Sequence, residues 1–406
     1  MKQDPTAARR GPLDGVVVLD LTQIYNGPYA TFLMAMAGAN VIKIEPEEGE
    51  HLRRRPHARG ATEPFAVLNA NKRSLVLDLK SDAGREVLLE LVRTADVLVE
   101  NFAPGVMKRL RLDEDTLRTV NPRLVIASGN GYGADGAYRD YTAMDLTVQA
   151  MTGVIAVTGH PDQAPVKAGP AVADFFAGTH LYGAIVTALY QRRVTGEGCN
   201  VEVAMMDALL PSLMSTLGLY KAGSKQNLRT GNGHGGLMIA PYNVYQAQDG
   251  GVAILAVSDQ HWDSLGSVLD CPELVTDQRF ADKMSRVKNR IALDTTIGEL
   301  AQKFTKKQLF ERLVAARIPS APVRELEEVI NDEHLHARGM LSWTEHPVYG
   351  RMLGMGSPLR FAGYAGPESI PSHELGADNR EVLAELVGID PQKYEALARA
   401  GAFGGQ

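Results

Sequence analysis

Short apolar runs alternate with helical patterns through the first half of the chain. Val16–Leu21 is a continuous apolar run, and a helical pattern separates it from a second run at Asn40–Glu45. Three more runs follow with helical patterns between them, at Ser74–Leu79, Asp96–Phe102 and Leu124–Asn130. Apolar strands that alternate with helices favour a parallel sheet covered by helices on both faces. The pattern therefore predicts an α/β fold with a large parallel-sheet domain.

The helical pattern from Ala173 to Arg193 is the longest in the chain, and a further strand is predicted at Asn200–Ala204. Between Lys225 and His234 the composition becomes polar and rich in glycine, which is typical of a linker or a functional loop. We therefore place a domain boundary here, with residues 1–224 in the large domain and residues 225–330 in a smaller one.

The predicted small domain has an α+β pattern. Two apolar runs flank Asp249-Gly250-Gly251 and predict a β-hairpin, and three helical patterns follow between about His261 and Ala316. The remaining segment, residues 331–406, contains short strands and two final helices from Met340 onward.

Composition and charge narrow the function classes. The 406 residues carry a formal net charge of −6, which disfavours general nucleic-acid binding. Cys199 and Cys271 are the two cysteines, so neither a disulfide scaffold nor a cysteine-rich metal site is expected. We find no apolar stretch that resembles a signal peptide or a membrane span, and we expect a cytoplasmic protein without membrane partners.

A local basic cluster could still hold a phosphorylated ligand, and the alternative is a solvated surface loop. Its members are Arg53, Arg54, Arg55, His57 and Arg59.

Asp174 is the first candidate for chemistry. It lies at the start of the long apolar helix, where aspartate is commonly an N-cap. A carboxylate near a helix N-terminus in apolar surroundings can instead stay ionised yet poorly solvated, as a nucleophile toward a thioester carbonyl must be. Asp145 also opens a helical pattern, and we interpret it first as a cap and second as a site residue.

Two glycine-rich stretches could bring backbone N–H groups to a ligand, Gly129–Gly133 and Gly231–Gly236. Neither has the spacing of a dinucleotide-binding or P-loop motif, and ordinary turns are the alternative. The sequence contains no HExxH or GxSxG motif, and His334 and His336 face different sides of a predicted helix, so a metal site is not expected.

Several segments, in the same order, resemble the class III CoA-transferase family, also called CaiB/BaiF, which includes formyl-CoA transferase. They are the VVVLDLT run from Val16 with its Gly-Pro, Gly38–Pro46, Asn71–Lys80, Ala95–Gly105, Asp174 with its helix, Arg192–Ala208 and Pro241–Gly250. The resemblance implies a large Rossmann-like domain to which residues 331–406 return, a small α+β domain, and two chains interlocked as a homodimer.

The resemblance also implies a mechanism. Asp174 would attack an acyl-CoA thioester to give an acyl-aspartyl anhydride, and the acceptor carboxylate would receive CoA through aspartyl intermediates. The loop Gly233, His234, Gly235 and Gly236 would close over them and supply backbone donors. Coenzyme A would be a substrate, so no separate cofactor is expected.

The family's CoA-binding positions carry over individually to this chain. They match Arg53, Leu77, Asp78, Lys80, Asn101, Phe102, Arg109, Gly131 and Tyr132. Arginines suit the phosphates of CoA, and Phe102 and Leu77 suit its adenine or pantetheine.

The chain departs from formyl-CoA transferase at positions near the expected substrate. Tyr25-Asn26 replaces Gln-Ala, and Pro46 and Asn130 each replace a basic residue. These differences disfavour formyl-CoA and oxalate, and we expect succinyl-CoA with a small dicarboxylate acceptor.

Two alternatives remain. A 2-methylacyl-CoA racemase-like isomerase would need a histidine where this chain has Met144, just before Asp145. A non-catalytic CoA-binding subunit is the second alternative, and the presence of Asp174 argues against it.

Overall fold

The computed structural model describes residues 11–55, 63–223, 228–364 and 368–405. The chain forms two compact units. The first comprises Met1–Val148, Pro170–Leu209 and Asp332–Gln406, and the second comprises Gln149–Gly169 and Leu210–Asn331. The predicted boundary at 224/225 lies outside the described residues, and the second unit begins at Leu210 and continues to Asn331. His57 and Arg59 of the basic cluster also lie outside the described part.

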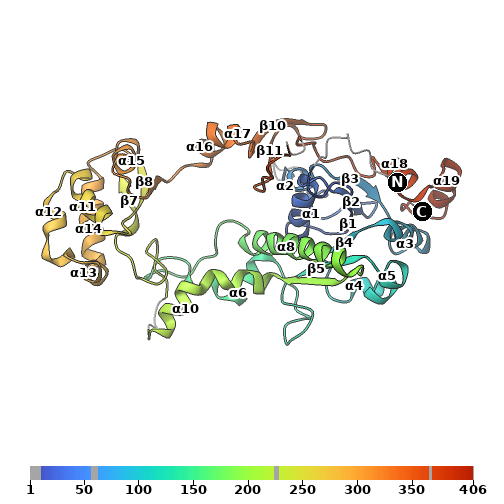
Figure 1. Cartoon of the computed structure of the whole chain (residues 1–406), viewed down its shortest axis with the longest axis horizontal. Coiled ribbons are helices and arrows are strands. Elements are labelled where there is room, and N and C mark those ends of the chain that lie inside the picture. Colours follow the sequence, from blue (N-terminus) through green and yellow to red (C-terminus); the bar gives the residue numbers. More distant parts are fainter. Residues whose placement is uncertain (1–10, 56–62, 224–227, 365–367, 406) are drawn as a thin grey trace. The chain divides into compact units, whose positions relative to one another are not determined.

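The first unit is built on a six-stranded parallel sheet with the strand order β3-β2-β1-β4-β5-β6 (Figure 1). The strands are β1 (Val17–Asp20), β2 (Asn40–Glu45), β3 (Arg73–Val76), β4 (Val97–Glu100), β5 (Val125–Asn130) and β6 (Asn200–Ala204). All six predicted strands are present. The central strands β1 and β4 were recognisable because strands buried on both faces are mostly apolar. The strand order reverses between β1 and β4, which is the place where open α/β sheets bind ligands.

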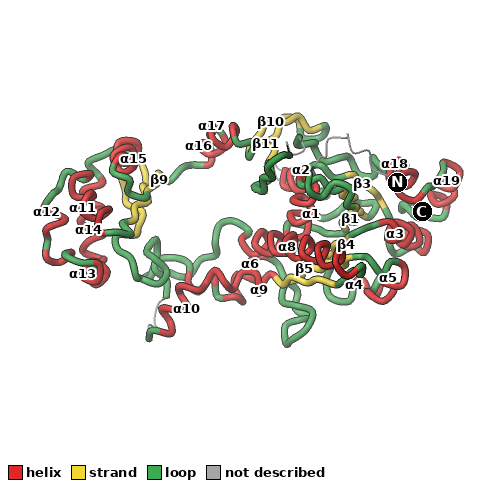
Figure 2. The backbone as a smooth tube through the Cα atoms, viewed as in Figure 1, coloured by secondary structure: helices red, strands yellow, loops and turns green. Residues whose placement is uncertain are grey.

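Helices of the first unit connect and cover these strands, as Figure 2 shows. They are α1 (Asn26–Met36), α2 (Glu63–Leu68), α3 (Asp82–Thr94), α4 (Val106–Arg109), α5 (Glu114–Val120), α6 (Asp145–Thr152, whose last residues belong to the second unit), α8 (Val172–Thr195) and α9 (Met205–Leu209).

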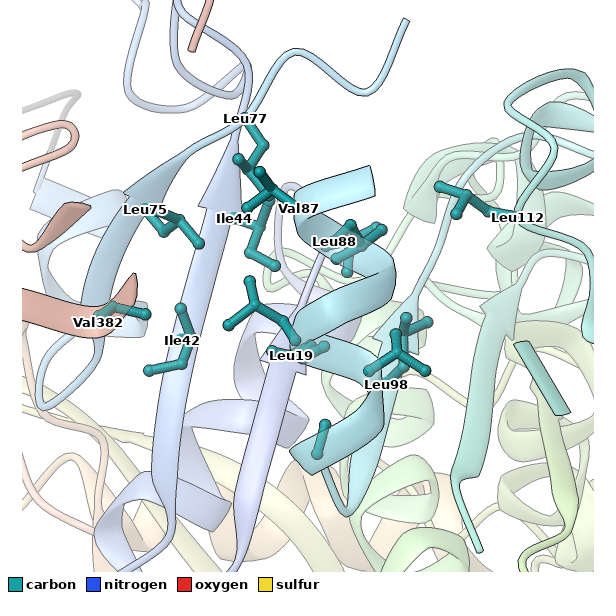
Figure 3. Packing of buried hydrophobic residues seen from close by; sticks show 14 of the residues in the cluster. Leu19, Ile42, Ile44, Leu75, Leu77, Val87, Leu88, Leu98, Leu112 and Val382 are labelled. Carbon is teal, nitrogen blue, oxygen red and sulfur yellow. The ribbon is translucent and has the colours of Figure 1, made fainter. Parts of the chain in front are cut away.

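Side chains that alternate along each strand supply two separate cores. In β1, Leu19 joins the core beneath α3, where Val87 and Leu88 are fully or nearly fully buried (Figure 3). Its neighbour Val18 points to the opposite face and packs in the core that includes Leu181 of α8. Successive strand residues face opposite sides of a sheet, so this alternation makes a three-layer α/β/α unit.

The C-terminal segment packs on the first unit after the chain has passed through the second. Its elements are α17 (Glu333–Ala337), β10 (Leu341–His346), β11 (Gly350–Met355), α18 (Asn379–Val387) and α19 (Pro391–Arg399). Val382 and Leu383 of α18 are fully buried in the same core as Leu75 of β3. The two final helices predicted from the sequence are α18 and α19.

The second unit is an α+β unit with a three-stranded antiparallel sheet in the order β7-β8-β9. Its elements are α7 (Val154–Val157), η1 (Leu210–Leu213), α10 (Met214–Lys221), β7 (Tyr242–Ala247), β8 (Gly250–Leu255), α11 (Asp259–Val268), α12 (Glu273–Thr276), η2 (Gln278–Phe280), α13 (Lys283–Lys288), α14 (Arg290–Ala301), α15 (Lys306–Ala315), β9 (Ser320–Pro322) and α16 (Leu326–Ile330). The hairpin prediction is confirmed by β7 and β8. The prediction of three helices was wrong, because α11 to α15 are five separate helices.

Helix α8 is long and apolar enough to cross a membrane by length and composition alone. Its residues Leu181 and Ile185 are fully buried against the sheet, and it also packs on α1. These contacts are those of a core helix.

Candidate active site

A cavity of about 1090 Å³ lies in the first unit, at the carboxyl ends of the parallel strands. Its walls are the segments that follow the strands, including Leu21–Ile24, Pro46–His51, Leu77–Ser81, Asn101–Pro104 and the glycine-rich turn Gly129–Gly133. The volume is at the upper end for small-ligand pockets, which span roughly 300–1,000 Å³. The parallel sheet thus brings segments that are far apart in sequence to one large binding space.

Most of the residues singled out from the sequence line this cavity. They are Asn26, Leu77, Asp78, Lys80, Asn101, Phe102, Asn130, Gly131, Tyr132 and Asp174. Others do not. Gly233, His234, Gly235 and Gly236 belong to the second unit, where Thr230 Oγ1 donates to the Gly233 carbonyl over 2.9 Å within a local turn.

Three predicted residues of the first unit lie outside the cavity lining. Arg53 forms a two-pronged ion pair with the fully buried Glu45 carboxylate, with Nη2 to Oε2 at 2.8 Å, and its guanidinium stacks 4.1 Å from the centre of the Phe65 ring. Arg109 is exposed on α4. The Tyr25 ring packs against Phe175, with 5.9 Å between the ring centres.

Asp174 lies within the first turn of α8, and 8% of its surface is exposed. The helix N-cap position is Ala171, which makes no side-chain capping bond. The interpretation of Asp174 as an N-cap is therefore wrong. Asp145 caps this helix instead, since its Oδ1 accepts from the backbone N–H of Ala173 at 2.8 Å and from that of Asp174 at 3.5 Å.

The Asp174 carboxylate accepts from a backbone donor on another helix. The N–H of Asn26 donates to it, and this N–H belongs to the first residue of α1, so no partner within that helix is available. Two helix N-termini, those of α1 and α8, thus meet at the carboxylate and place their positive ends beside it.

Burial, with a smaller contribution from the neighbouring Asp145 carboxylate, raises the pKa of Asp174 to about 7, and the Asn26 N–H acts in the opposite direction. At neutral pH a substantial share of the carboxyl group is therefore ionised although it has lost most of its water. A poorly solvated, relatively basic carboxylate facing a ligand cavity is suited to attack a carbonyl carbon.

Asn26 brings a second polar group to the same place. Its side chain is 3% exposed, and within the described part of the chain its Oδ1 has no hydrogen-bond partner. The carboxamide lies against Gly129, where a Cβ would come 3.0 Å from Oδ1. Gly129 therefore leaves the room that this carboxamide occupies, and a ligand in the cavity can reach it.

Several residues that line the cavity were not predicted from the sequence. Arg54 and His51 line the cavity, with Arg54 Nη2 3.2 Å from His51 Nδ1. Arg54 had been noted only within the basic cluster. Further parts of the wall come from Tyr141, whose ring centre is 6.2 Å from that of Tyr132, and from the C-terminal residues Ala400, Gly401, Gly404 and Gly405. No motif marks these residues, because only the fold brings them to the strand ends.

Comparison with known proteins decides the family. A model of CoA-transferase family III matches residues 13–379, nearly the whole chain. The chain belongs to CoA-transferase family III. It is therefore a CoA-transferase, and the family resemblance noted in the sequence is confirmed.

Curated relatives extend over almost the full length of this CoA-transferase. An acetyl-CoA:oxalate CoA-transferase from Acetobacter aceti is 36% identical over 95% of this chain and 99% of its own. A succinyl-CoA:mesaconate CoA-transferase from Haloarcula hispanica is 36% identical over 89% of this chain and 92% of its own. A solved CAIB/BAIF family protein from Brucella suis superposes with a TM-score of 0.82 at 32% identity, covering 93% of this chain and all of that one.

Proposed function

We propose that the enzyme moves CoA from an acyl-CoA donor to a small dicarboxylate through intermediates on Asp174. The observation that carries the proposal is the position of this carboxylate. It is buried at the wall of a cavity large enough for a CoA thioester, and the N-termini of α1 and α8 meet beside it.

The chemistry begins at the thioester of the donor. A carboxylate oxygen of Asp174 attacks the thioester carbonyl, the C–S bond breaks, and a mixed anhydride and CoA thiolate result. The thiolate then attacks the aspartyl carbonyl of the anhydride, which releases the donor acid and leaves an aspartyl-CoA thioester. No ATP is required, because the free energy of the first thioester is retained in each intermediate.

The acceptor completes the cycle by the same two steps in reverse. Its carboxylate attacks the aspartyl-CoA carbonyl and expels thiolate, and the thiolate attacks the acceptor carbonyl of the new anhydride. The acceptor-CoA ester leaves, and Asp174 is regenerated as a carboxylate. Each step develops negative charge on a carbonyl oxygen, and the Asn26 N–H and side-chain amide can donate to that charge.

Succinyl-CoA is the donor we propose, with an acceptor of four or five carbons. The relative named for succinyl-CoA and mesaconate supports this choice. Because another relative is named for acetyl-CoA and oxalate, the test also includes acetyl-CoA as a donor and oxalate as an acceptor. The test is mass spectrometry of CoA esters after incubation of the enzyme with succinyl-CoA or acetyl-CoA and oxalate, malate, mesaconate, itaconate, citramalate or glutarate. A new ester that requires both donor and acceptor supports the proposal. Deuterium entering an acyl-CoA from solvent without any acceptor would instead point to the isomerase alternative.

Arg54 is the arginine we expect to hold the phosphates of CoA. It lines the cavity, whereas the neighbouring Arg53 is bound to the Glu45 carboxylate, whose side chain is fully buried. Replacement of Arg54 by Ala should raise KM for the acyl-CoA roughly tenfold, the loss of one charge-assisted contact, with kcat little changed.

Arg55→Ala is the matched control, because Arg55 is exposed and outside the lining. Arg53→Ala should leave KM close to that of the parent but lower the free energy of unfolding by about 3–5 kcal/mol, since Glu45 loses its partner. A KM effect confined to Arg53→Ala would reverse this assignment.

We propose that the enzyme is cytoplasmic, acts without a separate cofactor and forms the interlocked homodimer of its family. Three large apolar side chains of α8 are exposed on the single chain, Phe176, Tyr190 and Val194, and a second chain packed on this helix would cover them. Light scattering should give about twice the mass of 43.9 kDa calculated for one chain.

A further inference from the structure

Three charged side chains are buried together beneath the N-terminus of α1. Asp20 at the end of β1 is 0% exposed, Lys43 of β2 is 1% exposed and Lys72 just before β3 is 2% exposed. The Lys72 Nζ lies 2.9 Å from Asp20 Oδ2, and the Lys43 Nζ lies 3.9 Å from Asp20 Oδ1. None of the three lines the cavity, so the mechanism proposed above does not use them.

Charges in this position require a reason, because removing ions from water costs several kcal/mol each and an apolar replacement is often at least as stable. Burial alone would raise the pKa of Asp20, but Lys43 and Lys72 outweigh it and hold the pKa well below its ordinary value. Asp20 therefore stays ionised throughout the working pH range of a protein. Burial lowers the pKa of Lys72 to about 8 although Asp20 acts against this shift, so the two side chains form an ion pair at neutral pH.

The cluster is hydrogen-bonded to both ends of the segment Thr22–Pro28. At the first end, Asp20 Oδ1 accepts from the Thr22 backbone N–H at 2.9 Å, and Lys43 donates to the Thr22 carbonyl. At the second end, Lys72 Nζ donates to the Pro28 carbonyl at 3.0 Å and lies 2.8 Å from Thr31 Oγ1. The segment is thus tied to the sheet from below at its entry and its exit.

The segment Thr22–Pro28 is strained, and it contains Asn26, whose N–H donates to Asp174. Ile24 has φ of 66°, a left-handed conformation that a β-branched residue rarely adopts. Such strain persists only where the surroundings enforce it. Two residues later, Asn26 presents its N–H to the Asp174 carboxylate and its carboxamide to the cavity.

We infer that Lys72 is a positioning residue, which holds the segment Thr22–Pro28 so that the Asn26 N–H and carboxamide are aimed at Asp174 and the reacting carbonyl. The inference rests on the proposed function of Asp174. Lys72 acts through Pro28 and Asp20 and does not touch the substrate. Because a displacement of about 1 Å at a reacting centre can cost about 10²-fold in rate, a loosened segment should lower kcat and not substrate binding.

The test compares Lys72→Met with the double variant Asp20→Asn/Lys72→Met. The single variant leaves Asp20 buried without the closer of its two lysine partners and is expected to be poorly stable. The double variant removes one charge of each sign, so the field on Asp174 changes little and the fold is expected to survive. In the double variant we expect kcat to fall about 10- to 100-fold, with KM for the acyl-CoA within about twofold of the parent.

Arg192→Met is the matched control. This substitution breaks a partly buried ion pair of the same unit, in which Arg192 Nη2 lies 2.8 Å from Asp96 Oδ1. Asp96 directly precedes β4, so the pair lies at the amino ends of the strands, whereas the cavity lies at their carboxyl ends. This variant should lose stability but keep kcat. If the folded double variant has the kcat of the parent, or if Arg192→Met loses as much, Lys72 has no positioning role.

A second measurement separates this inference from the proposed function. The pKa of Asp174 can be followed by ¹³C NMR of carboxyl-labelled aspartate, with Asp174→Asn identifying the signal. Loss of the Asn26 N–H should raise that pKa in the double variant, whether or not the enzyme transfers CoA. An unchanged pKa overturns the inference, whereas a raised pKa in a protein without transferase activity would leave the positioning intact and reject the function.

Discussion

Replacement of Asp174 by Asn is expected to lower kcat for CoA transfer at least about 10⁴-fold, the scale at which removal of a nucleophile acts in other enzymes. The carboxamide occupies the same volume at the wall of the cavity but cannot form the anhydride. CoA binding should persist, since the other residues that line the cavity are untouched. Steady-state kinetics and calorimetric titration with CoA measure the two quantities separately.

Asp113→Asn provides a control of the same chemistry. Asp113 is a true N-cap, whose Oδ1 accepts from the Thr116 N–H at 3.1 Å, and it lies outside the cavity. Its replacement should cost about 1 kcal/mol of stability or less and no activity. If Asp174→Asn is as active as Asp113→Asn, the carboxylate is not the nucleophile and the proposed mechanism is wrong.

The pH dependence of kcat/KM is the second large effect we expect. Transfer needs the ionised carboxylate, and the pKa of Asp174 is raised to about 7, mainly by burial. The rate should therefore rise about tenfold per pH unit well below that value and then level off, so that about 50-fold separates pH 5 from pH 7. An ordinary, solvated aspartate would give a flat profile over this range.

Asp145→Asn should move the rising part of the profile to lower pH. The substitution removes the like charge that raises the pKa of Asp174, yet its amide oxygen can still accept from Ala173 and keep the helix capped. An unshifted profile in this variant would exclude Asp145 as a determinant. If kcat/KM of the parent enzyme instead rises near pH 4, the pKa of Asp174 is not raised.

The raised pKa of Asp174 also makes the free energy of unfolding depend on pH. The folded protein holds the Asp174 proton more tightly than the unfolded chain, whose value is near the ordinary 3.8. The free energy of unfolding should therefore decrease as the pH rises from about 4 to about 7. Asp174→Asn, which has no charge to bury, should be more stable than the parent above pH 7. Activity at this position is gained at the expense of stability.

The sheet was predictable from the sequence because its central strands β1 and β4 are mostly apolar runs with helical patterns between them, and the strand bounds differ from the predicted ones by a few residues at most. The small unit was harder. Three helical patterns were predicted where the structure has five helices, including the short helices α12 and α13. Local contacts, such as the Asp282 side chain that caps α13, separate one helix from the next. A pattern of apolar positions does not report where a side chain will cap the next helix.

The electrostatics of the site could not be predicted, because each contact joins residues that are distant in the chain. Asp145 was interpreted as a cap of its own helix, but it caps α8 and acts on Asp174. The donor to Asp174 comes from Asn26 on another helix. Lys72 lay within a motif that matched the family, yet its burial beside Asp20 became visible only in the fold. Motifs identified the family, and tertiary contacts determined what each residue does.

The passage of the chain through the second unit before it returns to the first determines the order in which the cavity can form during translation. The strand ends from β1 to β5 leave the ribosome early, but the cavity wall at Ala400, Gly401, Gly404 and Gly405 and the buried Val382 of α18 follow only after Leu210–Asn331 of the second unit. A nascent chain stalled before α18 would expose the apolar side of β3. Such a chain should depend on chaperones and gain CoA binding only when synthesis has passed that point.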